Sequence, residues 1–184
     1  KATAPLKDLL ARDRSAHVVV MLGTVVVTAR GARKAVDKAR RELGIDTLDL
    51  FLMPWLGRAS RFSTSIQDAL VTMREKGIVR AVGTSIHDRQ RAGRLAADSI
   101  LDAFMLRYNA KHPGAEQDVF PHLAARNPMV ISYTATSWRQ LLKPLQGIQM
   151  PPWPGEDQAA MMPPLTAPLC YRFVLGSPHV HATW

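Results

Sequence analysis

The sequence contains very little cysteine and no long apolar run. Its one cysteine, Cys170, has no partner within the 184 residues for a disulfide, and it cannot build a cysteine metal site. No stretch approaches the ~20 uninterrupted apolar residues of a membrane-spanning helix, and the first residues, KATAPLKDLLARDR, lack the apolar core of a signal peptide. We therefore expect a reduced, cytoplasmic protein with no membrane contact. Hydrophobic residues at 47% and charged residues at 21% fit a single globular domain over residues 1–184.

Negative charge is also scarce. The chain has 24 Lys and Arg against 15 Asp and Glu, a net charge of +9, and much of the excess lies in residues 1–45. A basic balance is typical of nucleic-acid-binding proteins. However, no aromatic residue lies among these basic residues, and Ala32, Val36 and Leu43 supply the apolar stripe of an ordinary helix with a solvated charged face. We therefore do not expect a nucleic-acid partner.

Two nucleotide-binding patterns are missing, namely a G-x-G-x-x-G motif after a strand and a Walker A sequence. Short apolar runs instead alternate with amphipathic stretches. The alternation predicts strands at 17–22, 48–53, 79–82, 103–107, 129–133 and 179–183, and helices at 5–12, 30–43, 63–76, 89–97, 116–125 and 169–175. A proline-rich loop is expected at about 144–168. Strands joined by helices at this spacing predict a parallel α/β sheet, either open and doubly wound or closed into a barrel.

Five segments resemble the aldo-keto reductase family in order and spacing. They are RRELGIDTLDLFLMPW (40–55), ALVTMREKGIVRAVGTSIHD (69–88), FMLRYNAKH (104–112), VISYTATS (130–137) and CYRFVLGSPHVHATW (170–184). The resemblance runs from about residue 5 to the end. It implies an α/β fold, a parallel (β/α) barrel of TIM type whose active site lies at the carboxyl ends of its strands. Here that barrel is expected to be incomplete, with about six βα units and without the first two strands.

The family's activity is NADP-dependent reduction of aldehydes and other carbonyl compounds, so the resemblance implies NADP as cofactor. The positions that match the family's cofactor contacts would hold the nicotinamide carboxamide, stack on the nicotinamide ring, or touch the pyrophosphate. By resemblance, these cofactor-binding residues are Ser85, Asn109, Tyr133, Thr134 and Thr136. The asparagine that the family usually carries beside the serine is replaced by Ile86.

The catalytic positions depart from the family. Leu22 and Gly23 stand where the family has its catalytic lysine, and Pro54 stands where it has its catalytic histidine. The family's catalytic aspartate and tyrosine lie on and just after the second of the two strands that find no match. Reduction of a carbonyl needs a proton donor whose pKa is tuned by a neighbouring group, and proline, leucine and glycine cannot titrate. We therefore expect a catalytically impaired aldo-keto-reductase-like protein.

The alternative is a non-catalytic binding or regulatory subunit. An incomplete barrel leaves two open sheet edges, which proteins usually cover. Self-association or a partner chain would cover them.

The histidines offer few other sites. His87, followed by Asp88, is the one candidate for a substitute catalytic group, but adjacent strand residues point in opposite directions, and Asp88 is placed to cap helix 89–97. His179 and His181 share one strand face, yet no third ligand is identifiable, so no metal site is expected.

Overall fold

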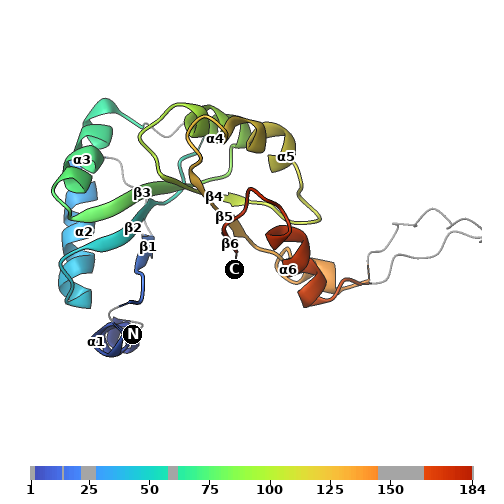
Figure 1. The fold of residues 1–184 in the computed structure, drawn as a ribbon, viewed down its shortest axis with the longest axis horizontal. Coiled ribbons are helices and arrows are strands. Elements are labelled where there is room, and N and C mark those ends of the chain that lie inside the picture. The colour runs from blue at the N-terminus through green and yellow to red at the C-terminus, as the bar shows by residue number, and fades with distance from the viewer. Residues whose placement is uncertain (1–2, 14, 22–27, 58–61, 145–163, 184) are drawn as a thin grey trace, which may run out of the picture.

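The computed structural model describes residues 3–13, 15–21, 28–57, 62–144 and 164–183. Within them, six strands form one sheet whose spatial order is the order of the chain, and every neighbouring pair is parallel. The strands are β1 (Val19–Met21), β2 (Leu48–Met53), β3 (Val79–Ile86), β4 (Ala103–Arg107), β5 (Met129–Tyr133) and β6 (Ala182–Thr183). The sheet curls into a half-barrel (Figure 1), which confirms the incomplete TIM-type barrel. A doubly wound sheet would reverse its strand order partway, and this one does not.

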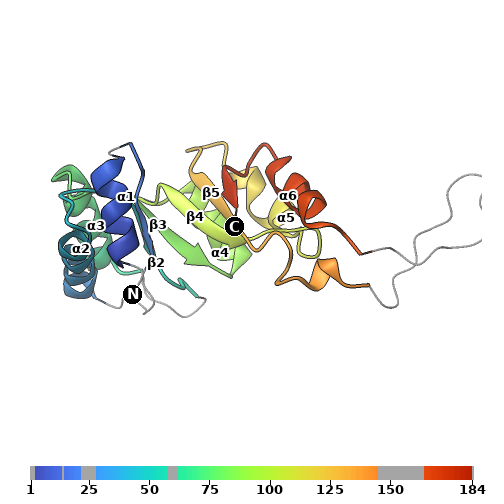
Figure 2. The ribbon, with the colours of Figure 1, turned by 90° about the horizontal axis from the view of Figure 1, so that it is seen from below.

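All helices but the first lie along the outer, convex side of the curl in Figure 1, whereas the first lies below the β1 end of the sheet; Figure 2 shows the strands from below. The helices are α1 (Thr3–Arg12), α2 (Ala29–Leu43), α3 (Thr64–Glu75), α4 (Arg89–Ala97), α5 (Ala115–Asp118) and α6 (Ala167–Leu175), with 3₁₀ turns at Phe120–His122 and Gln140–Leu142. Among the residues described, no helix is long and apolar enough to cross a membrane.

The two faces of the sheet pack differently because strand side chains alternate. In β2, Phe51 and Met53 join the main core between sheet and helices, whereas Leu50 and Leu52 join a smaller apolar cluster on the concave face. Gly83 of β3 lies between the neighbouring strands on that concave face. A Cβ there would come within 2.5 Å of the Ala103 carbonyl oxygen and 2.7 Å of the Leu52 side chain, so only glycine fits.

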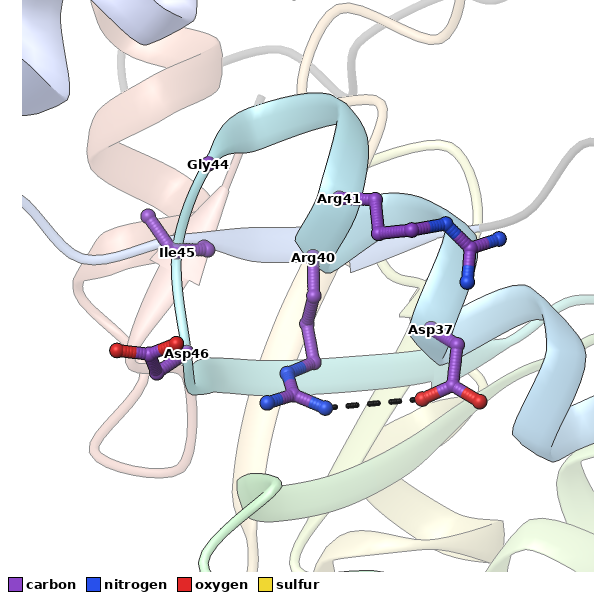
Figure 3. A pocket seen from close by; sticks show the side chains of 6 residues that line it. All are labelled: Asp37, Arg40, Arg41, Gly44, Ile45 and Asp46. Atoms are coloured by element: carbon purple, nitrogen blue, oxygen red, sulfur yellow. Dashed lines mark ion pairs between the residues drawn. The ribbon is translucent and has the colours of Figure 1, made fainter.

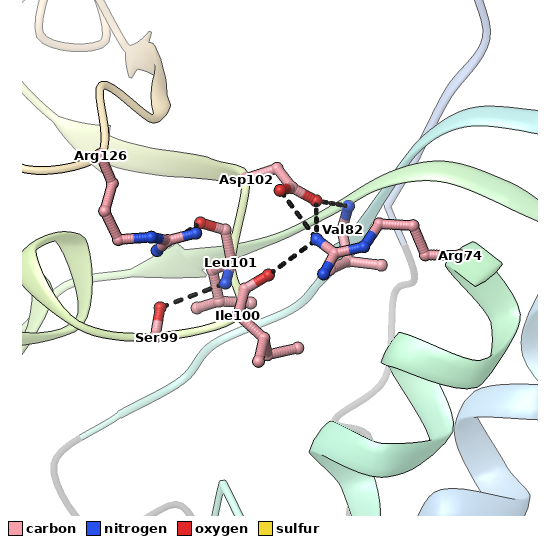
Figure 4. A network of polar contacts seen from close by, with 7 residues as sticks. All are labelled: Arg74, Val82, Ser99, Ile100, Leu101, Asp102 and Arg126. Atoms are coloured by element: carbon pink, nitrogen blue, oxygen red, sulfur yellow. Dashed lines mark hydrogen bonds and ion pairs between the residues drawn. The ribbon is translucent and has the colours of Figure 1, made fainter.

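A polar network fixes the amino edge of the sheet, where the strands begin (Figure 4). Asp102, just before β4, accepts hydrogen bonds from Arg74 Nη1 at 2.8 Å through both carboxylate oxygens and from the Val82 N–H at 3.0 Å. Arg74 Nη1 also donates to the Ile100 carbonyl oxygen at 3.2 Å. The network joins the end of α3, strand β3 and the segment that leads into β4. It therefore holds two adjacent βα units in register.

Most predicted elements are confirmed, with the bounds of β2, β4, β5 and α4 as predicted and Gly44 closing α2 in the left-handed conformation at φ 69°. The helix predicted at 116–125 is wrong. α5 stops at Asp118 and a 3₁₀ turn follows, because Pro121 has no N–H to continue an α-helix. β3 continues past the predicted residue 82 to Ile86.

The carboxyl-terminal predictions are confirmed only in part. The strand predicted at 179–183 is reduced to Ala182–Thr183, because the Val180 N–H bonds to the Ser177 carbonyl oxygen in a turn. Most of the proline-rich segment, residues 145–163, lies outside the described residues, as do Leu22 and Gly23. α6 begins at Ala167, inside the predicted loop, because Thr166 caps it and Pro168 is tolerated in a first helical turn.

Candidate functional site

The carboxyl ends of β3, β4 and β5 bring together several of the predicted residues. β3 ends at Ile86 and is followed by His87, β4 ends at Arg107, and β5 ends at Tyr133. The register places Arg107 opposite Tyr133, which packs in the concave cluster. By the alternation of each strand, Ser85 and Arg107 point to the same concave side.

His87 and Tyr133 form a hydrogen-bonded pair across the edge. The Tyr133 hydroxyl lies 2.9 Å from His87 Nδ1, and the two rings meet edge to face with centroids 5.7 Å apart. Burial raises the pKa of the Tyr133 phenol, although the Arg107 cation acts in the opposite direction. Burial, followed by the same cation, lowers the pKa of His87 below 6.5. At neutral pH, an uncharged imidazole therefore faces a neutral phenol, a pair able to share one proton.

Arg107 and Trp138 complete this group. The Arg107 guanidinium carbon lies 5.1 Å from the centroid of the Trp138 ring, and Trp138 also meets Tyr133 edge to face at 6.4 Å. Half of Trp138 remains exposed, at 55%. Neither residue was predicted to contribute. The available signal was the arginine itself, because a charge ends the otherwise apolar strand AFMLR.

Asn109 holds the surrounding loops. It is fully buried, its Nδ2 donates to the Thr134 carbonyl oxygen at 2.8 Å, and its Oδ1 accepts from the N–H groups of Lys111 and His112. This side chain joins the loop after β4 to the loop after β5. With its amide engaged in this way, it positions Thr134 and has no exposed surface for a ligand.

The hydroxyl groups of Thr134 and Thr136 are more accessible. Both residues are half-buried, and their Oγ1 atoms accept hydrogen bonds from the N–H groups of Trp138 and Arg139, each at 3.2 Å. A threonine hydroxyl that accepts one bond can still donate its own proton. The loop therefore offers two hydroxyl donors at the carboxyl edge.

The backbone of this edge is unusual at two points. Ser137, Trp138 and Arg139 have φ angles of 49°, 52° and 65°, and Trp55, after β2, has a φ of 46°. Residues other than glycine rarely adopt this left-handed region, and such positions cluster at functional sites. The two tryptophans that the structure describes, Trp55 and Trp138, both have this left-handed backbone, and they are 61% and 55% exposed.

Pro54 and Asp88 take the positions expected from the sequence. Pro54 directly follows β2, is buried, and has no group that titrates. Asp88 Oδ1 accepts a hydrogen bond from the Arg91 N–H at 3.0 Å, so Asp88 caps α4 as predicted. His87 is thus bonded to Tyr133, a residue 46 positions away, while its chain neighbour serves the helix.

The remaining candidate groups lie apart from this edge. His181 Nδ1 accepts a hydrogen bond from the Val130 N–H at 3.1 Å, and His179 packs on the Phe120 ring. In the part of the chain that the structure describes, no cluster of three His, Cys, Asp or Glu side chains could hold a metal ion. Cys170 is buried, and burial raises the pKa of its thiol, which makes it unreactive.

A pocket lies at the end of α2, near the amino edge of the sheet (Figure 3). Its lining comes from the last turns of the helix and from the segment that enters β2 at the amino edge. Arg40 there pairs with Asp37 at 3.6 Å within the same helix. This pocket is separate from the carboxyl-edge residues.

Comparison with solved structures identifies proteins of the same fold. An aldo-keto reductase from Bacillus halodurans, in its holo form, matches with a TM-score of 0.74 at 17% identity, over 98% of this chain and 66% of that one. A glycerol dehydrogenase from Gluconobacter oxydans matches with a TM-score of 0.64 at 22% identity, over 81% of this chain and 50% of that one. An aldo/keto reductase from Klebsiella pneumoniae, solved with NADP and acetate, matches with a TM-score of 0.62 at 18% identity, over 75% of this chain and 50% of that one.

The chain thus spans between 50% and 66% of the length of these three proteins. No curated protein sequence matches it. The model of the aldo/keto reductase family matches residues 18–147, more than half of the chain. On that match, the chain belongs to the aldo/keto reductase family.

Proposed function

We propose that the carboxyl edge binds the nicotinamide cofactor NADP(H), and that this chain reduces carbonyl compounds poorly. The observation that carries the first part is the convergence of Ser85, Tyr133 and the Thr134–Thr136 loop at one edge of the half-barrel. Ser85 and Tyr133 lie on adjoining parts of the concave face, and the loop begins directly after Tyr133. This is the end of the strands at which ligands bind in barrels of this type.

The residues suit the cofactor in kind. The hydroxyls of the half-buried Thr134 and Thr136 are donors for pyrophosphate oxygens, and Ser85 would offer its hydroxyl to the carboxamide although the residue is only 4% exposed. Tyr133 is only 6% exposed and Trp138 contacts its ring, so stacking of a nicotinamide on Tyr133 requires Trp138 to move. When bound, NADPH would supply the hydride that carbonyl reduction needs.

Proton transfer is the weak part of this site. Pro54 occupies the position of the family's catalytic histidine and has no proton to give, and by sequence Leu22 and Gly23 occupy that of its lysine. The nearest titratable pair is Tyr133 and His87. Because the pKa of Tyr133 is raised, this phenol is a poorer acid than an exposed tyrosine, and proton delivery to a carbonyl oxygen is slow.

Calorimetric titration with NADPH tests the binding. We expect a dissociation constant in the micromolar range for the wild-type chain and a clear loss of affinity in Tyr133→Ala. Tyr171→Ala is the matched control, because Tyr171 is exposed on α6, away from this edge. Absence of binding by a chain that is folded by circular dichroism would refute the cofactor site. Rapid turnover of a panel of aldehydes with NADPH would refute the impairment.

The second proposal is a binding or regulatory role in which self-association or a partner chain covers the open edges of the sheet. The outermost strand β1 favours it, because its concave-side residues Val19 and Met21 are 49% and 43% exposed. A half-barrel that ends in such a strand leaves backbone groups and apolar side chains open to pairing. Sedimentation velocity discriminates the self-association, since a monomer at all concentrations would count against it.

A further inference from the structure

Arg107 is the one charged residue among the strand residues that the structure describes on the concave face. By register and alternation, that face is otherwise formed by small, apolar and hydroxyl side chains, such as Leu52, Gly83, Met105 and Tyr133. A cation in such surroundings loses hydration, which is costly unless an anion or hydrogen-bond acceptor replaces the water.

Three other arginines beside the sheet have anionic partners. Arg74 pairs with Asp102 at 2.8 Å, Arg80 with Asp49 at 3.1 Å, and Arg89 with Asp118 at 2.7 Å. Within the described residues, no carboxylate forms an ion pair with Arg107, and its Nε is buried without a hydrogen-bond partner. Its described neighbours are instead Trp138, His87 and Tyr133, which are neutral at pH 7.

The arrangement around the guanidinium favours a flat, singly charged ligand. Trp138 covers the guanidinium in a cation–π contact, and the Tyr133 hydroxyl is a hydrogen-bond partner of the same group. An arginine has five N–H donors, so further donors in the guanidinium plane remain for a ligand. A carboxylate matches that planar fork with two parallel hydrogen bonds, and the exposed Trp138 ring would contact the organic part of the ligand. A phosphate matches the charge but has no flat organic part to pack against the Trp138 ring.

We propose that Arg107 and Trp138 form a binding site for the carboxylate group of a small, flat organic acid at the carboxyl edge of the half-barrel. Arg107 binds the carboxylate and Trp138 packs against the ligand. The site requires no nicotinamide cofactor, so it can be tested independently of the function proposed above.

The test uses sodium benzoate as the probe and benzamide as its uncharged match. The ¹⁵N-labelled chain is titrated without cofactor, and the Arg107 Nε–H and Trp138 indole N–H signals are followed by NMR, assigned through Arg107→Lys and Trp138→Phe. We expect benzoate to shift both signals and benzamide to shift neither. Affinity for benzoate should fall at least about tenfold in Arg107→Gln, the loss typical of a charged hydrogen-bond pair.

Two further variants make the outcome decisive. Arg89→Gln, at the same edge but paired with Asp118, should bind benzoate as the wild type does. Arg107→Lys keeps the charge but loses the fork, so it should bind with intermediate affinity and it covers the case in which Arg107→Gln is unfolded. Equal shifts with benzoate and benzamide, unchanged affinity in the folded Arg107 variants, or tighter binding of inorganic phosphate than of benzoate would each overturn the proposal.

Discussion

The charged side chains at the two edges of the sheet differ in whether they have a partner of opposite charge. At the amino edge, Asp102 and Asp49 are each bonded to an arginine and to a backbone N–H of a neighbouring strand or of the segment that enters it. At the carboxyl edge, Arg107 is without a described carboxylate partner, and left-handed backbone carries the exposed Trp138. A paired charge that also holds backbone contributes to stability, whereas an unpaired one costs stability and is available to a ligand. The half-barrel thus separates what holds it together from what can bind.

The strongest test of this contrast is Asp102→Ala. The substitution leaves Arg74 without its carboxylate and the Val82 N–H without its acceptor, so we expect the free energy of unfolding to fall by about 2–3 kcal/mol. Urea denaturation followed by circular dichroism measures it. Glu42→Ala removes the exposed Lys38–Glu42 pair and should cost about 0.5 kcal/mol or less. Equal losses in the two variants would contradict the structural role of the amino edge.

Asp49 makes the contribution of the amino edge to the stability of the fold depend on pH. Burial raises the pKa of its carboxyl, but the Val18 N–H, His17 and Arg80 outweigh burial and hold that pKa below its usual value. A carboxyl whose pKa is lower in the folded state stabilises the fold above its unfolded pKa of about 4, and the effect is lost as pH falls through the folded pKa. We expect Asp49→Asn to be about 1 kcal/mol less stable than wild type at pH 7. The difference should shrink steadily in denaturation series below pH 4, and a constant difference would count against it.

Paired substitutions of arginine compare the two edges directly. Arg107→Gln removes a charge with no described carboxylate partner, so we expect its free energy of unfolding to stay within about 0.5 kcal/mol of wild type. Arg74→Gln should cost more than about 1 kcal/mol, because it leaves Asp102 without its cation. Chemical denaturation of both variants under one condition checks the order. A larger loss at Arg107 would show that its contacts, too, hold the fold.

The smallest expected effect is a change in the pKa of His87. Arg107 helps to lower the pKa of His87, after burial, so Arg107→Gln should raise that pKa toward its usual value. An NMR titration of the His87 ring protons in both chains measures the change. An unchanged pKa of His87 in Arg107→Gln would contradict the influence of the cation.

The fold was largely predictable from sequence, because each buried strand is a short apolar run between helix-forming stretches. Prediction failed where another force decided the conformation. β3 runs on through Gly83, Thr84 and Ser85, which carry no apolar pattern but pair with β2 and β4. The helix predicted around Pro121 was wrong, because that proline interrupts the backbone hydrogen bonds.

The candidate site was predictable only in its separate parts. Tyr133 and His87 were each singled out, but their contact spans 46 residues, and no local pattern could reveal it. The resemblance pointed to Asn109, whereas its structural task of joining two loops depends on contacts with the Thr134 backbone. Arg107 was overlooked because one charge at the end of a strand is common. Its importance comes from the absence of a carboxylate among its described neighbours, which only the folded chain reveals.

The identity of spatial and chain order among the six strands has a consequence for how the protein is made. Each strand pairs with the one synthesised just before it, so no pairing waits for a distant part of the chain to leave the ribosome. Each parallel pairing still has to wait for a whole βα unit, so it forms more slowly than a hairpin, but it needs no strand from farther along the chain. The half-barrel can therefore grow by one βα unit at a time during translation, with the most recent strand always serving as the template for the next.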